Sequence, residues 1–327
     1  MKAKEMNMSI ANPAASTAKL SKPASSRNRI WNRLKRDKYL YLLGLPGLLC
    51  MLIFKYVPMW GTLIAFQDYS PYQGFLKSEW VGLENFERFF NNPDFYILLR
   101  NTIAINVLGL IFYFPVPIIL SLMLNEVRKE VFKRTIQSIV YLPHFLSWVI
   151  IAGLTFTMFA TGEGLVNNVL VAMGMKPVDW LTTPEFFWGF LTVQSIWKEA
   201  GWGTVIFLAA MANVDPQLYE AAKIDGANRL QQMWKITFPA IQNVIIILLI
   251  LRLGHIMDVG FEQVFLLQNS AVSDVANVFD TYIYRVGVQG AQFSYTTAVG
   301  LFKSVVGLLL VILSNKLVKK AGGEGFY

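Results

Sequence analysis

The chain has 327 residues, of which 54% are hydrophobic and 15% are charged. Soluble domains usually carry about 25% charged residues, so the composition excludes an ordinary soluble protein. The net charge of +8 does not indicate a nucleic-acid partner, because 10 of the 29 Lys and Arg precede the first apolar block and no soluble basic fold follows. The sequence therefore predicts an all-α, polytopic membrane protein.

Residues 1–38 form a polar, basic segment that we expect to be a cytoplasmic tail. The part from Met1 to Asn28 is rich in Ala, Ser, Lys and Pro, which predicts disorder. The segment does not have the form of a cleavable signal peptide, because the apolar block after it is too long. Two interpretations of the stretch from Arg29 to Lys38 stay open: a positive flank that sets the topology, or a short amphipathic helix on the inner leaflet.

Six apolar blocks are long enough to span the roughly 30 Å hydrocarbon core. They lie near residues 40–66, 98–124, 137–159, 187–211, 240–258 and 294–315. With the N-terminus inside, the inner segments hold 20 Lys and Arg and the outer segments hold 4, so the positive-inside rule predicts that both termini are cytoplasmic. We expect a first helix with an external loop over residues 39–97, a five-helix transmembrane domain over 98–315, and a cytoplasmic tail over 316–327.

The three outer segments, residues 67–97, 160–186 and 259–293, are more than tight turns. The stretch Leu83–Phe90 is amphipathic, and Val275–Val286 is a possible helix. These segments are long enough to form a surface for an external partner. The alternative is that they only cover the end of the helix bundle.

The inner loop 212–239, between the fourth and fifth blocks, predicts two helices joined by a turn. Asp215 is a good N-cap and a proline suits the position after it, so a helix is expected from Pro216 to Ile224. Asp225-Gly226 is a turn signal, because Gly tolerates a positive φ. A second short helix is expected from Asn228 to Ile236. The small side chains of Ala221 and Ala222 would let another protein approach the first helix closely.

This loop resembles the EAA loop of binding-protein-dependent ABC importer permeases, which forms a coupling helix that docks in a groove of the cytoplasmic ATPase. The resemblance rests on Glu220, Ala221, Ala222 and Gly226, and the longer run Tyr219–Ala227 is similar to the carbohydrate, MalF/MalG-like branch. Other segments resemble the LplB-type oligosaccharide permeases, so that the similarity covers roughly residues 35–327: Phe54–Met59, Ile64–Pro71, Val81–Phe86, Leu142–Phe145, Trp197–Trp202, Gly260–Phe265 and Gly325–Tyr327.

The resemblance implies a type I permease subunit of an ATP-driven oligosaccharide importer in the bacterial cell membrane, and not an enzyme. It implies three protein partners: a cytoplasmic ATPase dimer, a second homologous permease in a heterodimer, and an external solute-binding protein. The coupling residues would be Glu220, Ala221, Ala222, Asp225 and Gly226. The alternative for these residues is an ordinary turn after a solvated helix face.

No ATP-binding loop or metal site is expected in this chain. It contains no G-x-x-x-x-G-K-[ST] run, so ATP must be bound by the partner ATPase, and no cofactor is expected here. Cys50, His144 and His255 show no spacing typical of metal ligands.

Charged and aromatic residues inside the apolar blocks are candidates for a substrate pathway, because ionisable groups in a bilayer usually face the bundle interior. The candidates are Trp197, Lys198, Glu199 and Trp202, with Trp148, Asn106 and Tyr113 behind them. Arg252, His255 and Asp258 are expected on one helical face, and Lys303 lies in the sixth block. The alternative is that these groups pair to hold helices together. A competing function is an ion-coupled secondary transporter, which would need a carboxylate such as Glu199 deep in a span.

Overall fold

The computed structural model describes residues 35–323 and residue 325, and most of the predicted tail lies outside these residues. Contacts divide the chain into two units, Met1–Gly61 and Thr62–Tyr327. The described part of the first unit contains α2 (Lys38–Met51), the π-helical turn η1 (Leu52–Tyr56) and the first half of the 3-10 helix η2 (Val57–Phe66). No side chain of α2 is buried, which suits an apolar helix surrounded by lipid.

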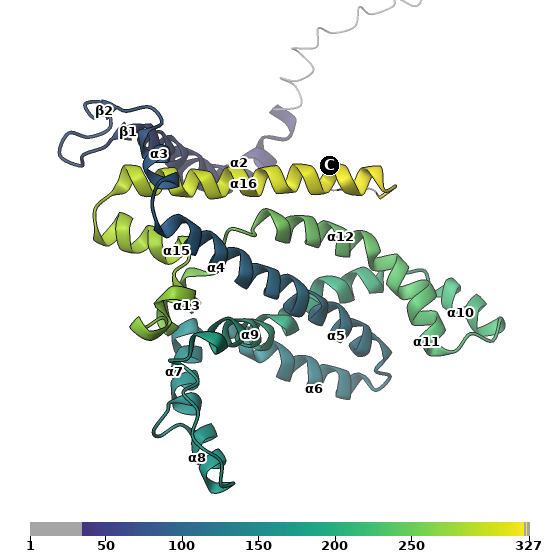
Figure 1. The fold of residues 1–327 in the computed structure, drawn as a ribbon. Helices are drawn as coiled ribbons and strands as arrows, with labels where there is room; N and C mark the ends of the chain where they lie inside the picture. The colour runs from purple at the N-terminus through teal and green to yellow at the C-terminus, as the bar shows by residue number, and fades with distance from the viewer. Residues whose placement is uncertain (1–34, 324, 326–327) are drawn as a thin grey trace, which may run out of the picture. The chain divides into compact units, whose positions relative to one another are not determined.

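The second unit is almost entirely helical (Figure 1). It starts with a short antiparallel pair of strands, β1 (Gln67–Asp68) and β2 (Glu79–Trp80), followed by α3 (Glu84–Phe90). The helix α3 confirms the amphipathic stretch predicted there. The buried side chain of Phe89 on α3 packs in an apolar cluster with residues of α4, α15 and α16.

A long helical segment follows from α4 (Asp94–Leu108) through the π-helical turn η3 (Gly109–Tyr113) to α5 (Pro115–Glu126). Pro115 and Pro117 have no N–H to donate within the helix. The wider turn before them accommodates this loss, with the N–H of Phe114 donating to the carbonyl of Gly109 at 3.0 Å. The distortion of this block at its prolines is therefore local.

The third apolar block is not one straight helix. The helix α6 (Glu130–Tyr141) ends in a short 3-10 turn, η4 (Leu142–Phe145), and α7 (Trp148–Phe159) then leaves at a bend of 98°. Pro143 disfavours continuation of α6, and Ser147 caps α7 by accepting from the N–H of Ile150. The expectation of a single span over 137–159 therefore needs correction to a bent pair, which continues into α8 (Leu165–Ala172).

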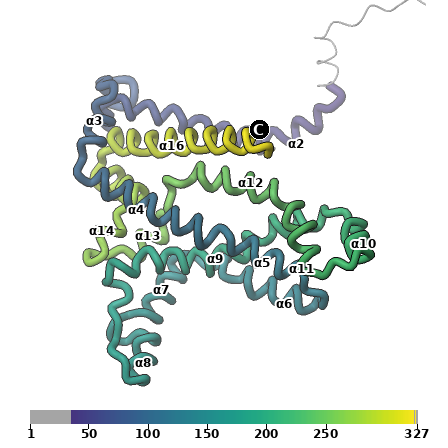
Figure 2. Tube along the Cα trace, turned by 45° about the vertical axis from the view of Figure 1, so that its right-hand side comes forward, coloured from purple at the N-terminus to yellow at the C-terminus, as the bar shows by residue number. Residues whose placement is uncertain are grey.

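The helix α9 (Pro184–Ala212) lies at the centre of the second unit and contacts α4, α5, α6 and α12 (Figures 1 and 2). One buried apolar cluster joins α9 to α4, α7 and α13. A second joins α9 to α5 and α12 through Ile118, Phe207 and Ile241. A helix covered on so many sides can carry polar residues without exposing them to lipid.

The inner loop contains α10 (Pro216–Ile224), with the predicted bounds, and then α11 (Arg229–Gln232). The second short helix is not separate, because α11, the π-helical turn η5 (Met233–Thr237) and α12 (Phe238–Gly254) form one continuous helix of 26 residues. The wide turn precedes Pro239 at the start of α12 and accommodates its missing N–H.

The chain after α12 returns through four short helical segments to the last long helix, α16 (Phe293–Lys320). In order they are α13 (Phe261–Leu267), η6 (Ser270–Val272) with α14 (Ser273–Ala276), α15 (Phe279–Tyr282) and η7 (Ile283–Gln289). The stretch 275–286, considered as a single helix, is interrupted at residues 277–278 and is divided among the last three elements before α16. The backbones of α12 and α16 approach closely at Gly254 and Gly307, where a Cβ on either residue would collide with the other helix, a small-residue contact common in membrane bundles.

Four helices in the described residues are long and apolar enough to cross a membrane: 38–66, 94–126, 229–254 and 293–320. The bent pair of α6 and α7 makes a fifth if both count as one span. The fourth predicted block forms α9, which has 29 residues, but Lys198 and Glu199 lower its mean hydropathy. The all-α class is confirmed, and the expected six spans depend on α9 and the bent pair.

Candidate functional site

The predicted coupling residues lie on an exposed helix and the turn that follows it. Asp215 caps α10 by accepting from the N–H of Gln217 at 2.9 Å, and no residue of α10 is buried in the described chain. Glu220 and Ala221 are exposed and Ala222 is half-buried. The turn residues Asp225 and Gly226 are exposed as well, and Gly226 has the predicted positive φ of 78°.

The exposed helix is nevertheless anchored to the transmembrane helices. The hydroxyls of Tyr219 on α10 and Thr237, just before α12, are 2.9 Å apart, and Thr237 is 1% exposed. Arg229 lies 3.9 Å from Glu126 at the end of α5, a long and half-exposed ion pair that contributes little. The apolar side chains of Leu218 and Ile224 are 52% and 87% exposed. The helix α10 therefore exposes two apolar side chains, while Tyr219 anchors it to Thr237.

A cavity of about 190 Å³ lies between α4, η3, α7, α9, the end of α12 and the start of α13. It brings together four of the predicted pathway residues, Asn106, Tyr113, Trp148 and Glu199. The remaining wall is formed by apolar, hydroxyl, amide and charged groups: Ile105, Gly109, Leu191, Thr192, Ser195, Arg252, Asp258, Val259, Gly260 and Gln263.

The other predicted pathway residues stand beside the cavity. Lys198 is 6% exposed, and its ammonium donates to the carbonyls of His144 and Leu146, at 2.7 Å each. Trp202 stacks on His144, with ring centroids 4.6 Å apart and planes 2° from parallel. Trp197 is 48% exposed and does not line the cavity. Lys198 and Trp202 thus hold the bend between η4 and α7 against α9.

Arg252 and Asp258 line the cavity, although the sequence analysis did not assign them to the pathway. They were expected on one helical face with His255, but α12 ends at Gly254 and His255 has non-helical torsions. The helix end turns these side chains to different neighbours. Their signal in the sequence was the presence of charge inside an apolar block, which does not say what each charge faces.

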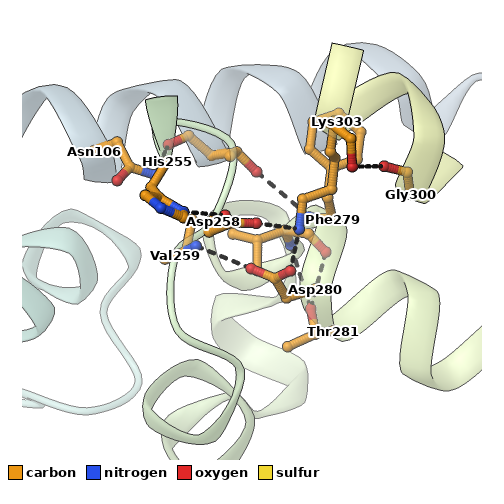
Figure 3. Close-up of polar contacts among 12 residues, drawn as sticks. Asn106, His255, Asp258, Val259, Phe279, Asp280, Thr281, Gly300 and Lys303 are labelled. Carbon is orange, nitrogen blue, oxygen red and sulfur yellow. Dashed lines mark hydrogen bonds and ion pairs between the residues drawn. The ribbon is translucent and has the colours of Figure 1, made fainter. Parts of the chain in front are cut away.

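An ion cluster fixes the wall of the cavity at Asp258 (Figure 3). Lys303 on α16, which is 8% exposed, lies 2.9 Å from Asp258 and also pairs with Asp280. Asp280 accepts from the N–H of Val259 at 2.9 Å, and His255 lies 3.1 Å from Asp258. The cluster therefore ties α16 and α15 to the segment that follows α12.

The carboxyl group of Asp258 lies beyond the end of α12, outside the four membrane-capable helices. Burial by itself raises its pKa, but the hydrogen bonds and charges of Lys303 and His255 outweigh burial and lower the pKa below its ordinary value. Asp258 therefore stays ionised at neutral pH and keeps its pairing with Lys303.

A family model described as "Binding-protein-dependent transport system inner membrane component" matches residues 95–322. The chain is 53% identical to the polygalacturonan/rhamnogalacturonan transport system permease protein YteP of Bacillus subtilis (strain 168), over 92% of this chain and 94% of YteP. It is 54% identical to protein LplB of the same strain, over 90% of this chain and 92% of LplB.

A solved structure is similar over nearly the whole chain. It is the crystal structure of a bacterial alginate ABC transporter in complex with an alginate pentasaccharide-bound periplasmic protein. One of its chains has a TM-score of 0.82 and 41% identity, covering 91% of this chain and all of that chain.

Proposed function

Because this chain belongs to the family of binding-protein-dependent transport system inner membrane components, we propose that it forms one half of the pore of an oligosaccharide importer. It is a permease subunit of a sugar ABC transporter, a multi-pass protein of the bacterial plasma membrane, and not an enzyme. The family assignment also replaces the alternative of an ion-coupled secondary transporter.

The proposal assigns α10 to the contact with a separate ATPase dimer. The observation that supports this assignment is that α10 is capped at its start by Asp215, has no buried residue, and exposes the apolar side chains of Leu218 and Ile224. Exposed apolar side chains rimmed by polar residues typically mark an interaction surface. Glu220, Ala221, Ala222, Asp225 and Gly226 would form the part that enters the ATPase groove.

Movement of α10 would reach the cavity through α12. The Tyr219–Thr237 hydrogen bond joins the two helices, and α12 continues to Arg252 at the cavity. At about 1.5 Å per residue, this rigid helix spans roughly 22 Å. ATP-driven closure of the ATPase dimer would therefore re-orient the wall that contains Arg252 and Asp258.

The remaining partners follow from the same proposal. The 20 to 4 distribution of Lys and Arg favours six spans with cytoplasmic termini, and hence a cytoplasmic position for α10. A second homologous permease would complete the pore as a heterodimer. An external solute-binding protein would deliver the sugar, as the alginate transporter was solved with such a protein. The polygalacturonan/rhamnogalacturonan permease among the relatives supports an oligosaccharide cargo.

The test is affinity purification of the tagged protein from its native membrane in mild detergent, followed by mass spectrometry, with a Gly226→Asp variant. Gly174→Asp is the matched control, because Gly174 and Gly226 are both exposed, have φ of 81° and 78°, and have nothing within 4 Å of a built Cβ. We expect an ATPase and a second permease with the wild type and the control, and loss of the ATPase from Gly226→Asp.

Two outcomes would contradict the proposal. Absence of any ATPase from the wild-type preparation would remove the importer assembly. Loss of transport in Gly226→Asp with the ATPase still bound would separate Gly226 from docking and remove the role assigned to α10.

A further inference from the structure

We propose that Arg252 is the residue that recognises the cargo's charge, so that the cavity accepts sugars that bear a carboxylate, such as uronic-acid oligosaccharides. This inference rests on the proposed importer function and narrows its substrate class. The observation behind it is that both carboxylates of the cavity have cationic or imidazole partners, whereas the guanidinium of Arg252 has no carboxylate partner among the described residues.

The first carboxylate of the cavity, Glu199, is already engaged. Its Oε2 lies 2.7 Å from Nδ1 of His144, and its Oε1 lies 3.5 Å from the ammonium of Lys198. Lys198 is held behind it by the carbonyls of His144 and Leu146. Neither His144 nor Lys198 lines the cavity, and the ammonium of Lys198 offsets part of the negative charge of Glu199, which lowers its repulsion of an anionic ligand.

The second carboxylate, Asp258, is engaged in the same way. Lys303 lies 2.9 Å from one of its oxygens and His255 lies 3.1 Å from the other. Figure 3 shows Asp258 and Asp280 on the ammonium of Lys303, with Asp280 also accepting from the backbone of Val259. The ammonium of Lys303, which does not line the cavity, therefore offsets part of the negative charge of Asp258.

Arg252 has no such partner. Among the residues that the structure describes, no carboxylate lies within ion-pair distance of its guanidinium. The group lies over the ring of Tyr113, 5.6 Å from the centroid, where cation–π attraction favours this position of the guanidinium. A Cβ on Gly109 would lie 3.1 Å from Nη2 of Arg252, so this glycine leaves the space that the guanidinium occupies.

A carboxylated sugar matches the groups around this guanidinium. Arg presents a planar fork of donors that binds a carboxylate in a bidentate manner, with better geometry than Lys. Trp148 and Tyr113 bring aromatic rings to the cavity, with Lys198 and Arg252 over one face of the respective ring, and Asn106 and Ser195 offer partners for sugar hydroxyls. A neutral sugar would use the same walls but would leave Arg252 buried by the ligand without a counter-charge, which is costly.

The experiment measures uptake by the assembled transporter in proteoliposomes with one binding protein throughout. The two cargoes are trigalacturonate and the same trisaccharide with its carboxyl groups reduced to alcohols. The variants are Arg252→Gln, Arg252→Lys and the control Arg285→Gln, because Arg285 also lies over a tyrosine, 5.8 Å from the ring of Tyr282, but does not line the cavity.

We expect wild type and Arg285→Gln to prefer the acidic cargo. Arg252→Gln should lower the acidic-to-neutral ratio of uptake by about 10-fold or more, the effect of losing a charge-assisted hydrogen-bonded pair. Arg252→Lys should fall between them, because it keeps the charge and loses the fork. Retained uptake of the neutral trisaccharide by Arg252→Gln shows that the variant folds and assembles.

The inference is overturned if wild type carries the neutral trisaccharide as well as the acidic one. It is also overturned if Arg252→Gln lowers uptake of both cargoes equally, since that result indicates a structural role. Either result leaves the importer function standing. Absence of ATP-dependent uptake of both sugars by wild type would refute the substrate class, and absence of a co-purified ATPase would refute the function itself.

Discussion

Replacement of Gly201 by alanine should separate α6 from α9 and destabilise the protein. A Cβ on Gly201 would lie 2.6 Å from the carbonyl carbon of Val140 and closer still to its oxygen. Cβ atoms essentially never approach other heavy atoms within 3.0 Å, so the helices must move apart by more than 0.4 Å. The neighbour is backbone, which cannot rotate away as a side chain can.

The magnitude follows from two opposing effects. Alanine is favoured over glycine within a helix by about 1 kcal/mol, whereas overpacking of a close contact costs about 1–3 kcal/mol and occasionally more. Because the obstacle is backbone, we expect the upper part of that range and a net loss of about 2 kcal/mol. The same separation lengthens the 2.7 Å hydrogen bond from Lys198 to the carbonyl of His144, so transport should fall as well.

The assay is thermal unfolding of the purified protein in detergent, monitored by loss of the monodisperse chromatographic peak. For a chain of this length, a loss of about 2 kcal/mol corresponds to a midpoint lower by about 3 °C. Gly189→Ala is the control, since Gly189 lies on the same helix and a Cβ there meets nothing within 4 Å. Equal midpoints for Gly201→Ala and Gly189→Ala would refute the close crossing of α6 and α9.

Three further substitutions test contacts elsewhere in the second unit. Lys303→Met should destabilise by about 1–3 kcal/mol, because it removes the cation beside Asp280, whose side chain is only 18% exposed, and adding Asp280→Asn should recover part of the midpoint; no recovery would argue against the ion pair. Asn167→Ala removes hydrogen bonds to three carbonyls, one backbone N–H and one indole N–H around α8. Residues 160–183 should therefore become sensitive to limited proteolysis. The control Asn168→Ala removes one 3.4 Å hydrogen bond and should behave as wild type. Tyr219→Phe leaves a buried threonine hydroxyl unpaired at a cost of about 1–3 kcal/mol and should lower the sugar transported per ATP hydrolysed; an unchanged ratio would exclude that hydrogen bond from coupling.

Local features were predictable wherever residues near in sequence decide the structure. The helix Pro216–Ile224 has the predicted bounds, because Asp215 caps it and Gly226 takes the positive φ that ends it. The first, second, fifth and sixth apolar blocks form helices long and apolar enough to cross a membrane. In each case hydrophobic length or a cap acts over a few turns of one helix, and the sequence contains the whole cause.

The bend of 98° between α6 and α7 is not decided by residues near in sequence. The apolar block 137–159 has the composition of one span, and Pro143 alone permits either a kink or a break. The direction of α7 depends on Lys198 and Trp202 of α9, which hold the bend through the carbonyls of His144 and Leu146 and the ring of His144. These residues are separated by more than 50 positions in the chain.

The sequence by itself determined that the chain is helical, which blocks are apolar, and where the exposed helix α10 begins and ends. Tertiary structure alone decided which charges meet. Arg252, His255 and Asp258 share a helical spacing, but α12 ends at Gly254, so Asp258 joins Lys303 and Arg252 lies over Tyr113. The reason is physical: the free energy of a buried charge depends on its partners within a few ångströms, and only packing of α9, α12 and α16 brings those partners together.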